Sequence, residues 1–339
     1  MGIALGVGLT SACVFNCRHC YSGGGANPVE MDTERLFRFM ENLDVGSVNL
    51  GTGESCLHPQ YHQVLDRLFD SGIPVAVTTA GPSVEALSDC ELARLHDVDF
   101  SLDFPNADHH DQWRSDGAFR MVLRGIQRCS SLGVTASVAM CLMGQNAMFM
   151  EEMCHLCTSL GVSLRVNVYK AVSSHAFQAD YDSFWKAVDT FFRFSSRAVS
   201  SEPIVNAALA RQIGVSPFRT MGSPCGIRSL RLRPDGGVLP CVYWNSSSLT
   251  MDEYLPGAGE ISCGRLLDLP ELCAHCPEVE ICSGGCAGRR LYTGKNEPDI
   301  YCFRKEGRYF PDISVPAVLE GNSYVHSSYL CTMIAEFGS

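Results

Sequence analysis

The sequence lacks any long apolar run. None of its stretches approaches the ~20 apolar residues that a helix needs to cross a bilayer. It also lacks the basic segment of a signal peptide, because Met1-Gly2-Ile3-Ala4-Leu5-Gly6 carries no charged side chain and runs directly into a cysteine loop. Gly6 stands where a myristoylation motif has Ser or Thr. We therefore expect no membrane association and a cytoplasmic protein.

Positive charge is also scarce. The chain has 26 Lys and Arg residues and 37 Asp and Glu residues, which gives a net charge of −11. Such a chain has no general attraction for nucleic-acid phosphates or anionic lipids, so neither is expected as a partner. A hydrophobic fraction of 46% and a charged fraction of 19% are typical of a globular protein. The 339 residues can bury a full core and a second, smaller one.

Cysteine, in contrast, is abundant. The chain has 18 cysteines, several of them closely spaced. Disulfide-dense chains are usually short and secreted, whereas this one is long and has no export signal. The clustered spacings therefore indicate metal binding, and we predict an oxygen-sensitive metalloprotein.

The first cluster of cysteines is Cys13-Val14-Phe15-Asn16-Cys17-Arg18-His19-Cys20, with the spacing C-x3-C-x2-C. Three thiolates on a tight loop can hold three corners of a cubane iron–sulfur cluster and leave its fourth iron open, whereas electron-transfer clusters normally take four cysteines. Zinc is the alternative, but zinc sites usually combine two separate pairs of ligands. The spacing favours the open cluster over zinc.

Strand-like apolar runs alternate with helical patterns from Ile3 to Phe194. The predicted strands are Ile3–Thr10, Ser47–Gly51, Pro74–Thr79, Val98–Asp103, Val134–Met143 and Ser163–Tyr169. The predicted helices are Thr33–Leu43, Pro59–Ser71, Val84–His96, Gly117–Leu132, Met148–Leu160 and Tyr181–Phe194. Successive βα units predict an α/β fold with a parallel sheet and right-handed crossovers. Because the cysteine loop follows the first strand, we predict a partial (β/α)6 TIM-type barrel with its site at the carboxyl ends of the strands.

Other candidate site residues also follow predicted strands. Gly51-Thr52-Gly53-Glu54 comes after the second strand, where small residues allow a ligand to approach the backbone closely. Ser101 and Asp103 end the fourth strand, and Asn167 lies on the sixth. Capping of loop ends explains the last three residues equally well.

Two further pairs are interpreted as structural. His109 and His110 are expected to be solvated in a polar loop. Cys154 and Cys157 form a C-x2-C in the middle of a predicted helix, whereas a redox pair would lie at a helix N-terminus. We therefore expect them to lie on a helix face.

A second cysteine system follows a Ser-rich connection. Ser229–Arg233 and Val238–Val242 alternate as two strands around a Pro-Asp-Gly-Gly turn, which predicts a hairpin that brings Cys225 and Cys241 together. A dense run then has the cysteines Cys273, Cys276, Cys282, Cys286 and Cys302. By itself, the combination of C-x2-C and C-x3-C is also compatible with zinc.

These motifs resemble a known family. Cys13, Cys17 and Cys20 resemble the signature of radical S-adenosylmethionine (SAM) enzymes, and the seven cysteines from Cys225 to Cys302 resemble the SPASM domain. His19 departs from the family, which commonly has an aromatic residue before the third cysteine. The resemblance implies a radical SAM partial barrel over residues 1–200, a linker over 201–222, an iron–sulfur SPASM domain over 223–304 and a tail over 305–339 that packs on the barrel.

The resemblance also implies the cofactors, namely SAM and three [4Fe–4S] clusters. Cys13, Cys17 and Cys20 would hold the radical-generating cluster, whose open iron binds SAM. The first auxiliary cluster would take Cys225, Cys241 and Cys286, with Cys263 or an open position as its fourth ligand, and the second would take Cys273, Cys276, Cys282 and Cys302. Gly51, Thr52, Gly53 and Glu54 would contact the methionine part of SAM, and Ser101, Asp103 and Asn167 its ribose.

The implied activity is reductive cleavage of SAM to a 5′-deoxyadenosyl radical that takes hydrogen from a substrate C–H bond, with flavodoxin or ferredoxin as electron donor. Peptide modification is the broadest class: cross-linking, oxidation or decarboxylation. Because the cysteine loop starts almost at Met1, leader-peptide recognition is expected to need a separate protein or the barrel surface. Val242 stands where the sulfatase-maturing branch usually has an acidic residue, which argues against formylglycine formation.

Two alternatives remain from the sequence. One is a sugar or aminocyclitol dehydrogenase or epimerase, in which Cys263, Cys331 or Cys141 would donate hydrogen. The other is a non-catalytic metal-binding module, a hypothesis that assigns no function to the Gly51–Glu54 turn. Acid/base candidates for either enzyme are Tyr169, Lys170, Tyr243 and Asp103.

Overall fold

The structure is a computed structural model of the chain, and it describes residues 2–22, 27–214, 225–244, 249–254, 261, 266–320 and 332–338. The chain forms two compact units. The first comprises Met1–Ala139, Gly226–Ile261 and Val325–Ser328, and the second comprises Met140–Cys225, Ser262–Tyr324 and Tyr329–Ser339. In the described ranges no helix combines the length and apolar character needed to cross a membrane.

Parallel strands form the centre of the first unit. These strands are β1 (Ile3–Val7), β2 (Val45–Leu50), β3 (Val75–Thr79), β4 (Asp97–Ser101) and β5 (Thr135–Leu142), the last of which runs on into the second unit. Each pairs in parallel with the next one along the chain, and their carboxyl ends therefore share one edge. The predicted α/β class with a parallel sheet is confirmed.

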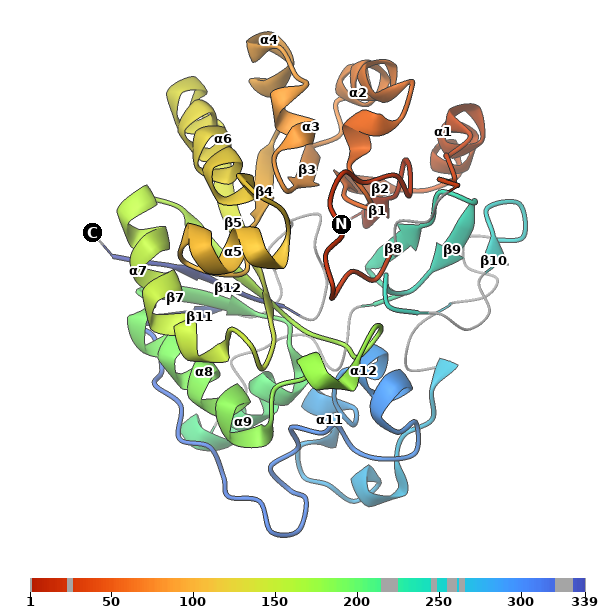
Figure 1. The fold of residues 1–339 in the computed structure, drawn as a ribbon. Coiled ribbons are helices and arrows are strands. Elements are labelled where there is room, and N and C mark those ends of the chain that lie inside the picture. Colours follow the sequence, from red (N-terminus) through yellow and green to blue (C-terminus); the bar gives the residue numbers. More distant parts are fainter. Residues whose placement is uncertain are drawn as a thin grey trace. The chain divides into compact units, whose positions relative to one another are not determined.

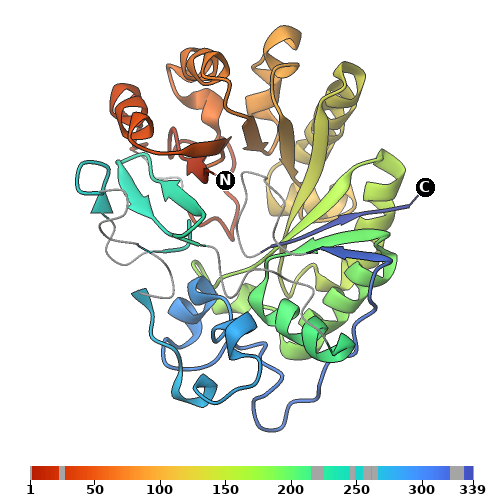
Figure 2. The ribbon, with the colours of Figure 1, turned by 180° about the vertical axis from the view of Figure 1, so that it is seen from behind.

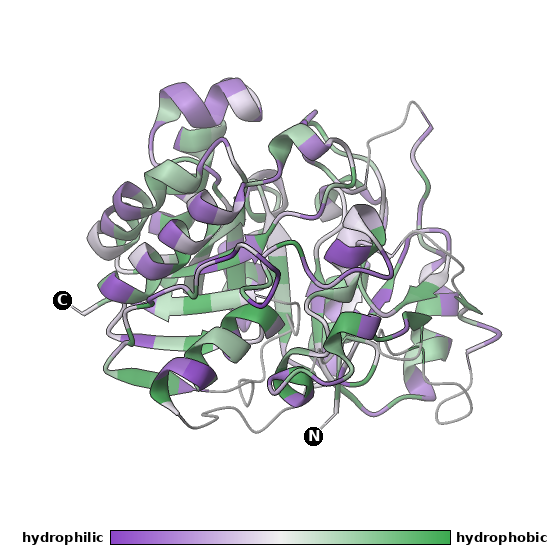
Figure 3. Ribbon diagram, turned by 90° about the horizontal axis from the view of Figure 1, so that it is seen from below, coloured by the Kyte–Doolittle hydropathy of each residue, from purple (hydrophilic) through white to green (hydrophobic). Residues whose placement is uncertain are grey.

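Helices connect these strands. They are α1 (Thr33–Glu41), α2 (Tyr61–Asp70), α3 (Pro82–Glu85), α4 (Asp89–Leu92), α5 (Ala107–Trp113) and α6 (Ala118–Leu132), with the 3-10 turn η1 (Ser55–Leu57) before α2. Figure 1 shows α1, α2 and α6 along the outer side of β1–β4. Leu36, Val64 and Val122 are buried on these three helices. Figure 3 shows hydrophilic (purple) and hydrophobic (green) residues interspersed along the helices of the protein. Amphipathic helices thus cover the outer face of the sheet.

Two local predictions are wrong. The single helix predicted over Val84–His96 is divided into α3 and α4, because Ser88 starts a new helix as an N-cap that forms a capping box with Glu91. The polar loop predicted at His109 and His110 is the helix α5, which Asn106 caps by accepting a hydrogen bond from the His109 N–H. His110 is buried rather than solvated.

The predicted hairpin is confirmed and extends the sheet. Strands β8 (Ser229–Leu232) and β9 (Gly237–Leu239) are antiparallel, and β10 (Leu249–Thr250) pairs with β9. Strand β8 also pairs in parallel with β1, so the order in this unit is β10-β9-β8-β1-β2-β3-β4-β5. The hairpin therefore lies beside the strand that leads into the first cysteine loop.

The second unit has its own group of strands. They are β6 (Ser163–Val168), β7 (Arg197–Ser200), β11 (Val318–Glu320) and β12 (Thr332–Glu336), in the order β6-β12-β7-β11. Strand β12 is antiparallel to both of its neighbours, and Figure 2 shows this blue strand beside the green β7. The tail after residue 305 thus contributes strands to the sheet.

The helices of the second unit are α7 (Met150–Leu160), α8 (Tyr181–Phe194), α9 (Pro203–Ile213), α11 (Val279–Cys282) and α12 (Ala287–Thr293), with short 3-10 turns η2 (Ala147–Phe149), η3 (His175–Phe177) and η4 (Glu271–Cys273). Cys154 and Cys157 are buried on one face of α7, as predicted. The expected linker over 201–222 contains α9, whose first turn has a proline. The limits of the predicted domains stay predictions.

Helix α6 contacts the sheet through a glycine, which gives a testable prediction. A Cβ atom at Gly125 would lie 2.3 Å from the Cε1 atom of Phe100, a fully buried side chain on β4. An alanine within a helix is normally more stable than glycine by ~1 kcal/mol. We expect Gly125→Ala to do the opposite and lower the free energy of unfolding by about 1–3 kcal/mol, because the core is overpacked.

The measurement is a denaturant titration beside Ser130→Ala, which changes an exposed residue of the same helix and should leave stability within about 0.5 kcal/mol. A Gly125→Ala variant as stable as this control would contradict the close packing of α6 on Phe100.

Candidate functional site

Three cysteines lie in the loop after β1. Cys13, Cys17 and Cys20 are all partly buried. Burial, and to a smaller extent the charges of Glu54, Cys17 and Cys20, raise the pKa of Cys13 to about 11. The three thiols are therefore within electrostatic reach of one another, and the surroundings of Cys13 disfavour its free thiolate. A cluster of iron ions would supply the positive charge that such a set of thiolates needs.

The Gly51–Glu54 turn is hydrogen-bonded to the cysteine loop. The Glu54 N–H donates to the Ala12 carbonyl oxygen at 2.8 Å, directly before Cys13. Gly53 has φ +62°, and a Cβ atom there would lie 2.4 Å from the Ala12 oxygen and 2.6 Å from the Thr10 oxygen. Glycine is required both for the backbone conformation and for the space. The structure thus brings together two motifs that are distant in the sequence. Cys20, the last cysteine of the first motif, is 31 positions before Gly51, the first residue of the second.

Glu54 is held firmly in this turn. Its carboxylate is 2% exposed and accepts hydrogen bonds from the Thr79 hydroxyl, the Ala80 N–H and the Ser83 hydroxyl, each at 2.7 Å. Burial raises the pKa of Glu54, and these donors oppose the shift. The connection from β3 to α3 therefore fixes the orientation of the carboxylate beside Cys13, whose pKa it affects.

Asp103 forms a buried ion pair in the same unit. Its Oδ2 atom accepts hydrogen bonds from Arg114 Nε at 2.9 Å and Nη2 at 2.8 Å, and the Asp103 side chain is fully buried. The third nitrogen, Nη1, lies 3.6 Å from the Sγ atom of Cys17. Sequence reasoning missed Arg114, although an arginine that follows the buried Trp113 shortly after a strand-end aspartate was an available signal.

His19 also lies near Oδ2 of Asp103. Its Nε2 atom lies 3.7 Å from Asp103 Oδ2, and its Nδ1 atom accepts a hydrogen bond from Trp113 Nε1 at 2.6 Å. The proton of the neutral ring is therefore on Nε2, facing the carboxylate. Burial lowers the pKa of His19. The ring also stacks on Trp113 with a centroid distance of 5.8 Å, so this position keeps aromatic packing despite its departure from the family.

Tyr21 links the end of the loop to the glycine turn. Its hydroxyl lies 3.0 Å from the Gly51 carbonyl oxygen, to which it donates, and 3.2 Å from Thr52 Oγ1. Burial raises the pKa of Tyr21 to about 12. Tyr243, an acid/base candidate, packs edge-on against Tyr21 at 5.5 Å.

The remaining candidates are divided between the two units. Ser101 ends β4 in the first unit, whereas Asn167 on β6 and Cys141 on β5 belong to the second unit. The Tyr169 hydroxyl bonds to Ser173 and Ser174, and Lys170 is buried. Cys263 and Cys331 lie outside the described residues.

Four thiols of the second unit share one neighbourhood. Burial raises the pKa of Cys282 well above its usual value, and Asp299, Cys302, Cys273 and Cys276 raise it further. These are the four cysteines that the family resemblance assigns to one auxiliary cluster, and an all-thiol set suits iron–sulfur chemistry. Within the ranges that the structure describes, no three cysteine, histidine or carboxylate side chains converge as ligands of a single ion would.

The other three cysteines of this system are also buried. Cys225 and Cys286 belong to the second unit, and Cys241 to the first. The Cys286 N–H donates to Asp299 Oδ2 at 2.9 Å, which connects this cysteine to a buried ion-pair network.

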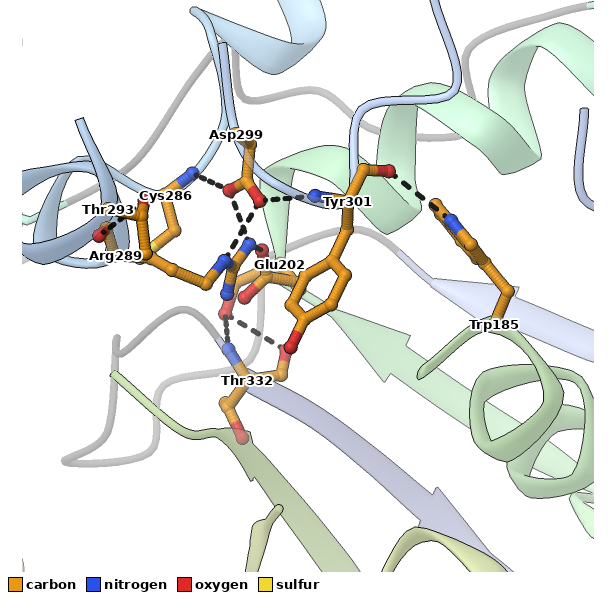
Figure 4. Close-up of polar contacts among 9 residues, drawn as sticks. Trp185, Glu202, Cys286, Arg289, Thr293, Asp299, Tyr301 and Thr332 are labelled. Carbon is orange, nitrogen blue, oxygen red and sulfur yellow. Dashed lines mark hydrogen bonds and ion pairs between the residues drawn. The ribbon is translucent and has the colours of Figure 1, made fainter. Parts of the chain in front are cut away.

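Figure 4 shows this network. Arg289 lies between Glu202 and Asp299, with Nη2 at 2.7 Å from Glu202 Oε1 and 2.5 Å from Asp299 Oδ2, and all three side chains are 0% exposed. Asp299 also accepts the Tyr301 N–H at 3.0 Å. Glu202 is the N-cap of α9. The network therefore ties α9 to the cysteine-rich segment through protein groups alone.

The fold and the loop of three cysteines define a class of protein. Residues 7–157 match the model of the Radical SAM superfamily, so this part of the chain is a radical SAM domain and the radical SAM part of the resemblance is confirmed.

Comparisons with individual protein sequences and with solved structures identify particular proteins that this chain resembles. The chain is 25% identical over 328 residues to the mycofactocin maturase MftC of Mycolicibacterium smegmatis, covering 87% of this chain and 81% of the relative. Its fold resembles that of native anSMEcpe with bound AdoMet, with a TM-score of 0.65, 16% identity and coverage of 88% and 93%. It also resembles Streptococcus suis SuiB bound to the precursor peptide SuiA, with a TM-score of 0.60, 15% identity and coverage of 89% and 74%.

The close contact at Gly53 gives a prediction about the cysteine loop. Gly53→Ala should displace the carbonyl groups of Thr10 and Ala12, because backbone atoms cannot move aside as a side chain can. We expect the variant to bind much less iron on anaerobic reconstitution than the parent protein. Gly72→Ala is the matched control, since Gly72 has φ +72° but nothing within 4 Å of the added Cβ. Its free energy of unfolding should fall only by the ~1–2 kcal/mol that a left-handed backbone conformation costs a residue with a Cβ atom, and it should bind as much iron as the parent protein.

Equal iron contents in the two variants would show that the contact between Gly53 and the cysteine loop is not required for cluster binding.

The buried network gives a second prediction. Arg289→Met leaves Glu202 and Asp299 without their cation, so the free energy of unfolding should fall by about 3–5 kcal/mol. Arg197→Met, which breaks partly exposed pairs with Glu320 and Glu336, should cost no more than about 1 kcal/mol. Denaturant titration of both variants checks the difference, and equal losses would refute the structural importance of Arg289.

Proposed function

We propose that the protein is a radical SAM enzyme with SPASM-type auxiliary clusters that modifies a peptide. The observation that carries the proposal is the hydrogen-bonded contact between the loop of Cys13, Cys17 and Cys20 and the Gly53–Glu54 turn, inside the matched radical SAM domain. The maturase MftC and the SuiB complex with a precursor peptide support a peptide as the substrate.

The residues fit the expected cofactors. Cys13, Cys17 and Cys20, which are partly buried, would hold a [4Fe–4S] cluster. When bound, the cluster and SAM supply a 5′-deoxyadenosyl radical able to take hydrogen from a C–H bond. The fixed carboxylate of Glu54 is suited to accept hydrogen bonds from the amino group of SAM, because its orientation is already set by Thr79, Ala80 and Ser83.

We expect the second cysteine system to hold two auxiliary clusters. Cys273, Cys276, Cys282 and Cys302 would hold one, and Cys225, Cys241 and Cys286 would contribute to the other. Such clusters are suited to accept the electron left on an oxidised substrate or to bind the substrate directly. Flavodoxin or ferredoxin in the cytoplasm would provide the reducing electron, and a separate protein could present the leader peptide.

The first test is cofactor cleavage. After anaerobic reconstitution with iron and sulfide, the reduced protein should convert SAM to 5′-deoxyadenosine, measured by liquid chromatography. Cys17→Ala should reduce the rate at least about a thousandfold, because the effect of losing a cluster ligand exceeds that of losing one catalytic hydrogen bond. Cys90→Ala changes an exposed cysteine and should retain the parent rate. A fully loaded parent protein that forms no 5′-deoxyadenosine would contradict the proposal.

The second test concerns the substrate. Short peptides encoded beside the gene should lose hydrogen or carbon dioxide when incubated with the enzyme and SAM, as mass spectrometry would detect. Deuterium transfer into 5′-deoxyadenosine from a labelled peptide would confirm the abstraction. Transfer from a labelled sugar or aminocyclitol instead would replace the peptide by a small molecule and leave the radical SAM assignment intact.

A further inference from the structure

One cation in the described part of the first unit points at a cysteine of the radical site. Arg114 Nη1 lies 3.6 Å from Cys17 Sγ, while Nε and Nη2 donate to Asp103 at 2.9 and 2.8 Å. Both of these nitrogens contact the same carboxylate oxygen, which leaves the third nitrogen, Nη1, for the contact with the sulfur atom. A guanidinium keeps its charge at all relevant pH values.

The backbone on both sides of this contact is also fixed. The Arg114 N–H donates to the His110 carbonyl oxygen at 2.9 Å, and the Asp103 N–H donates to His110 Nδ1 at 3.2 Å. His110 is fully buried, so it holds both ends of the segment that includes α5. The guanidinium therefore reaches Cys17 at little further cost in conformational entropy.

The Arg114 guanidinium places a positive charge and an N–H group 3.6 Å from the Cys17 sulfur atom. A positive charge and an N–H group beside a ligand sulfur stabilise negative charge on that sulfur. Reduction adds one electron to an iron–sulfur cluster, and hydrogen bonds to its sulfurs raise the reduction potential.

We propose that Arg114 is a positioning residue that donates an N–H···S hydrogen bond to Cys17 and makes the radical-generating cluster easier to reduce. Asp103, which the sequence suggested as a ribose ligand, orients Arg114 for this contact. The inference rests on the proposed function, since it requires a [4Fe–4S] cluster on Cys13, Cys17 and Cys20.

The experiment is a redox titration of the reconstituted holoenzyme followed by electron paramagnetic resonance. The relevant cluster is identified as the one whose spectrum changes when SAM is added. Arg114→Gln should lower the ratio of reduced to oxidised cluster at a given potential about tenfold, which corresponds to a midpoint lower by 59 mV for one electron. Arg114→Lys keeps the charge and should lose less than half of that shift.

Arg124→Gln is the matched control, because it also removes one positive charge but from a surface pair with Glu85 on the outside of the same unit. Its midpoint should equal that of the parent protein. An Arg114→Gln midpoint no lower than this control overturns the inference, even if iron content falls. If Arg114→Gln holds no cluster, a lowered midpoint in Arg114→Lys supports the inference and an unchanged one overturns it.

Different results would contradict the proposed function and the proposed role of Arg114. A parent protein whose spectra do not respond to SAM would contradict the proposed function. A parent protein that responds and cleaves SAM, with midpoints independent of residue 114, would contradict only the role of Arg114.

Discussion

The candidate site depends on one backbone contact, the hydrogen bond from the Glu54 N–H to the Ala12 carbonyl oxygen. It exists because β1 and β2 are parallel neighbours, so that the loops after both strands start from the same edge of the sheet. Gly53 makes the close approach possible. Through this contact the cysteine loop is attached to the turn that fixes Glu54, and Glu54 in turn is bonded to the connection after β3. Three successive strand ends therefore support one set of thiols.

Buried charge is the second constraint on both units. Each unit contains partly or fully buried thiols near carboxylates, and each contains a partly or fully buried arginine whose positive charge offsets theirs. Arg114 pairs with Asp103 next to Cys17, and Arg289 pairs with Glu202 and Asp299 next to Cys286. An unpaired charge would be costly at such positions. The arginines allow acidic residues and thiols to share low-dielectric surroundings, in which bound iron would supply further positive charge.

The sequence predicted the elements whose signal is local. Every predicted strand from Ile3 to Tyr169 has a counterpart in β1–β6, and the hairpin at Pro234–Gly237 is present. Two errors arose where a helix N-cap decides the structure and the pattern of polar and apolar residues does not show it. Ser88 caps a new helix inside the single helix that was predicted. Asn106 starts a helix in a segment that is polar enough to suggest a loop. Strand β12 was missed for another reason, since its pairing with β6 and β7 joins residues more than 100 positions apart.

The sequence alone determined the cysteine spacing, the order of strands and helices and the position of a glycine turn after β2, because these features depend on residues close together in the chain. It therefore determined the class of chemistry. Only the tertiary structure decided which charged groups meet. Arg114 contacts Cys17 across 97 positions and Arg289 contacts Glu202 across 87, and no periodic pattern encodes such pairs. They form because folding buries these charges, and a buried charge is stable only where the fold provides its partner.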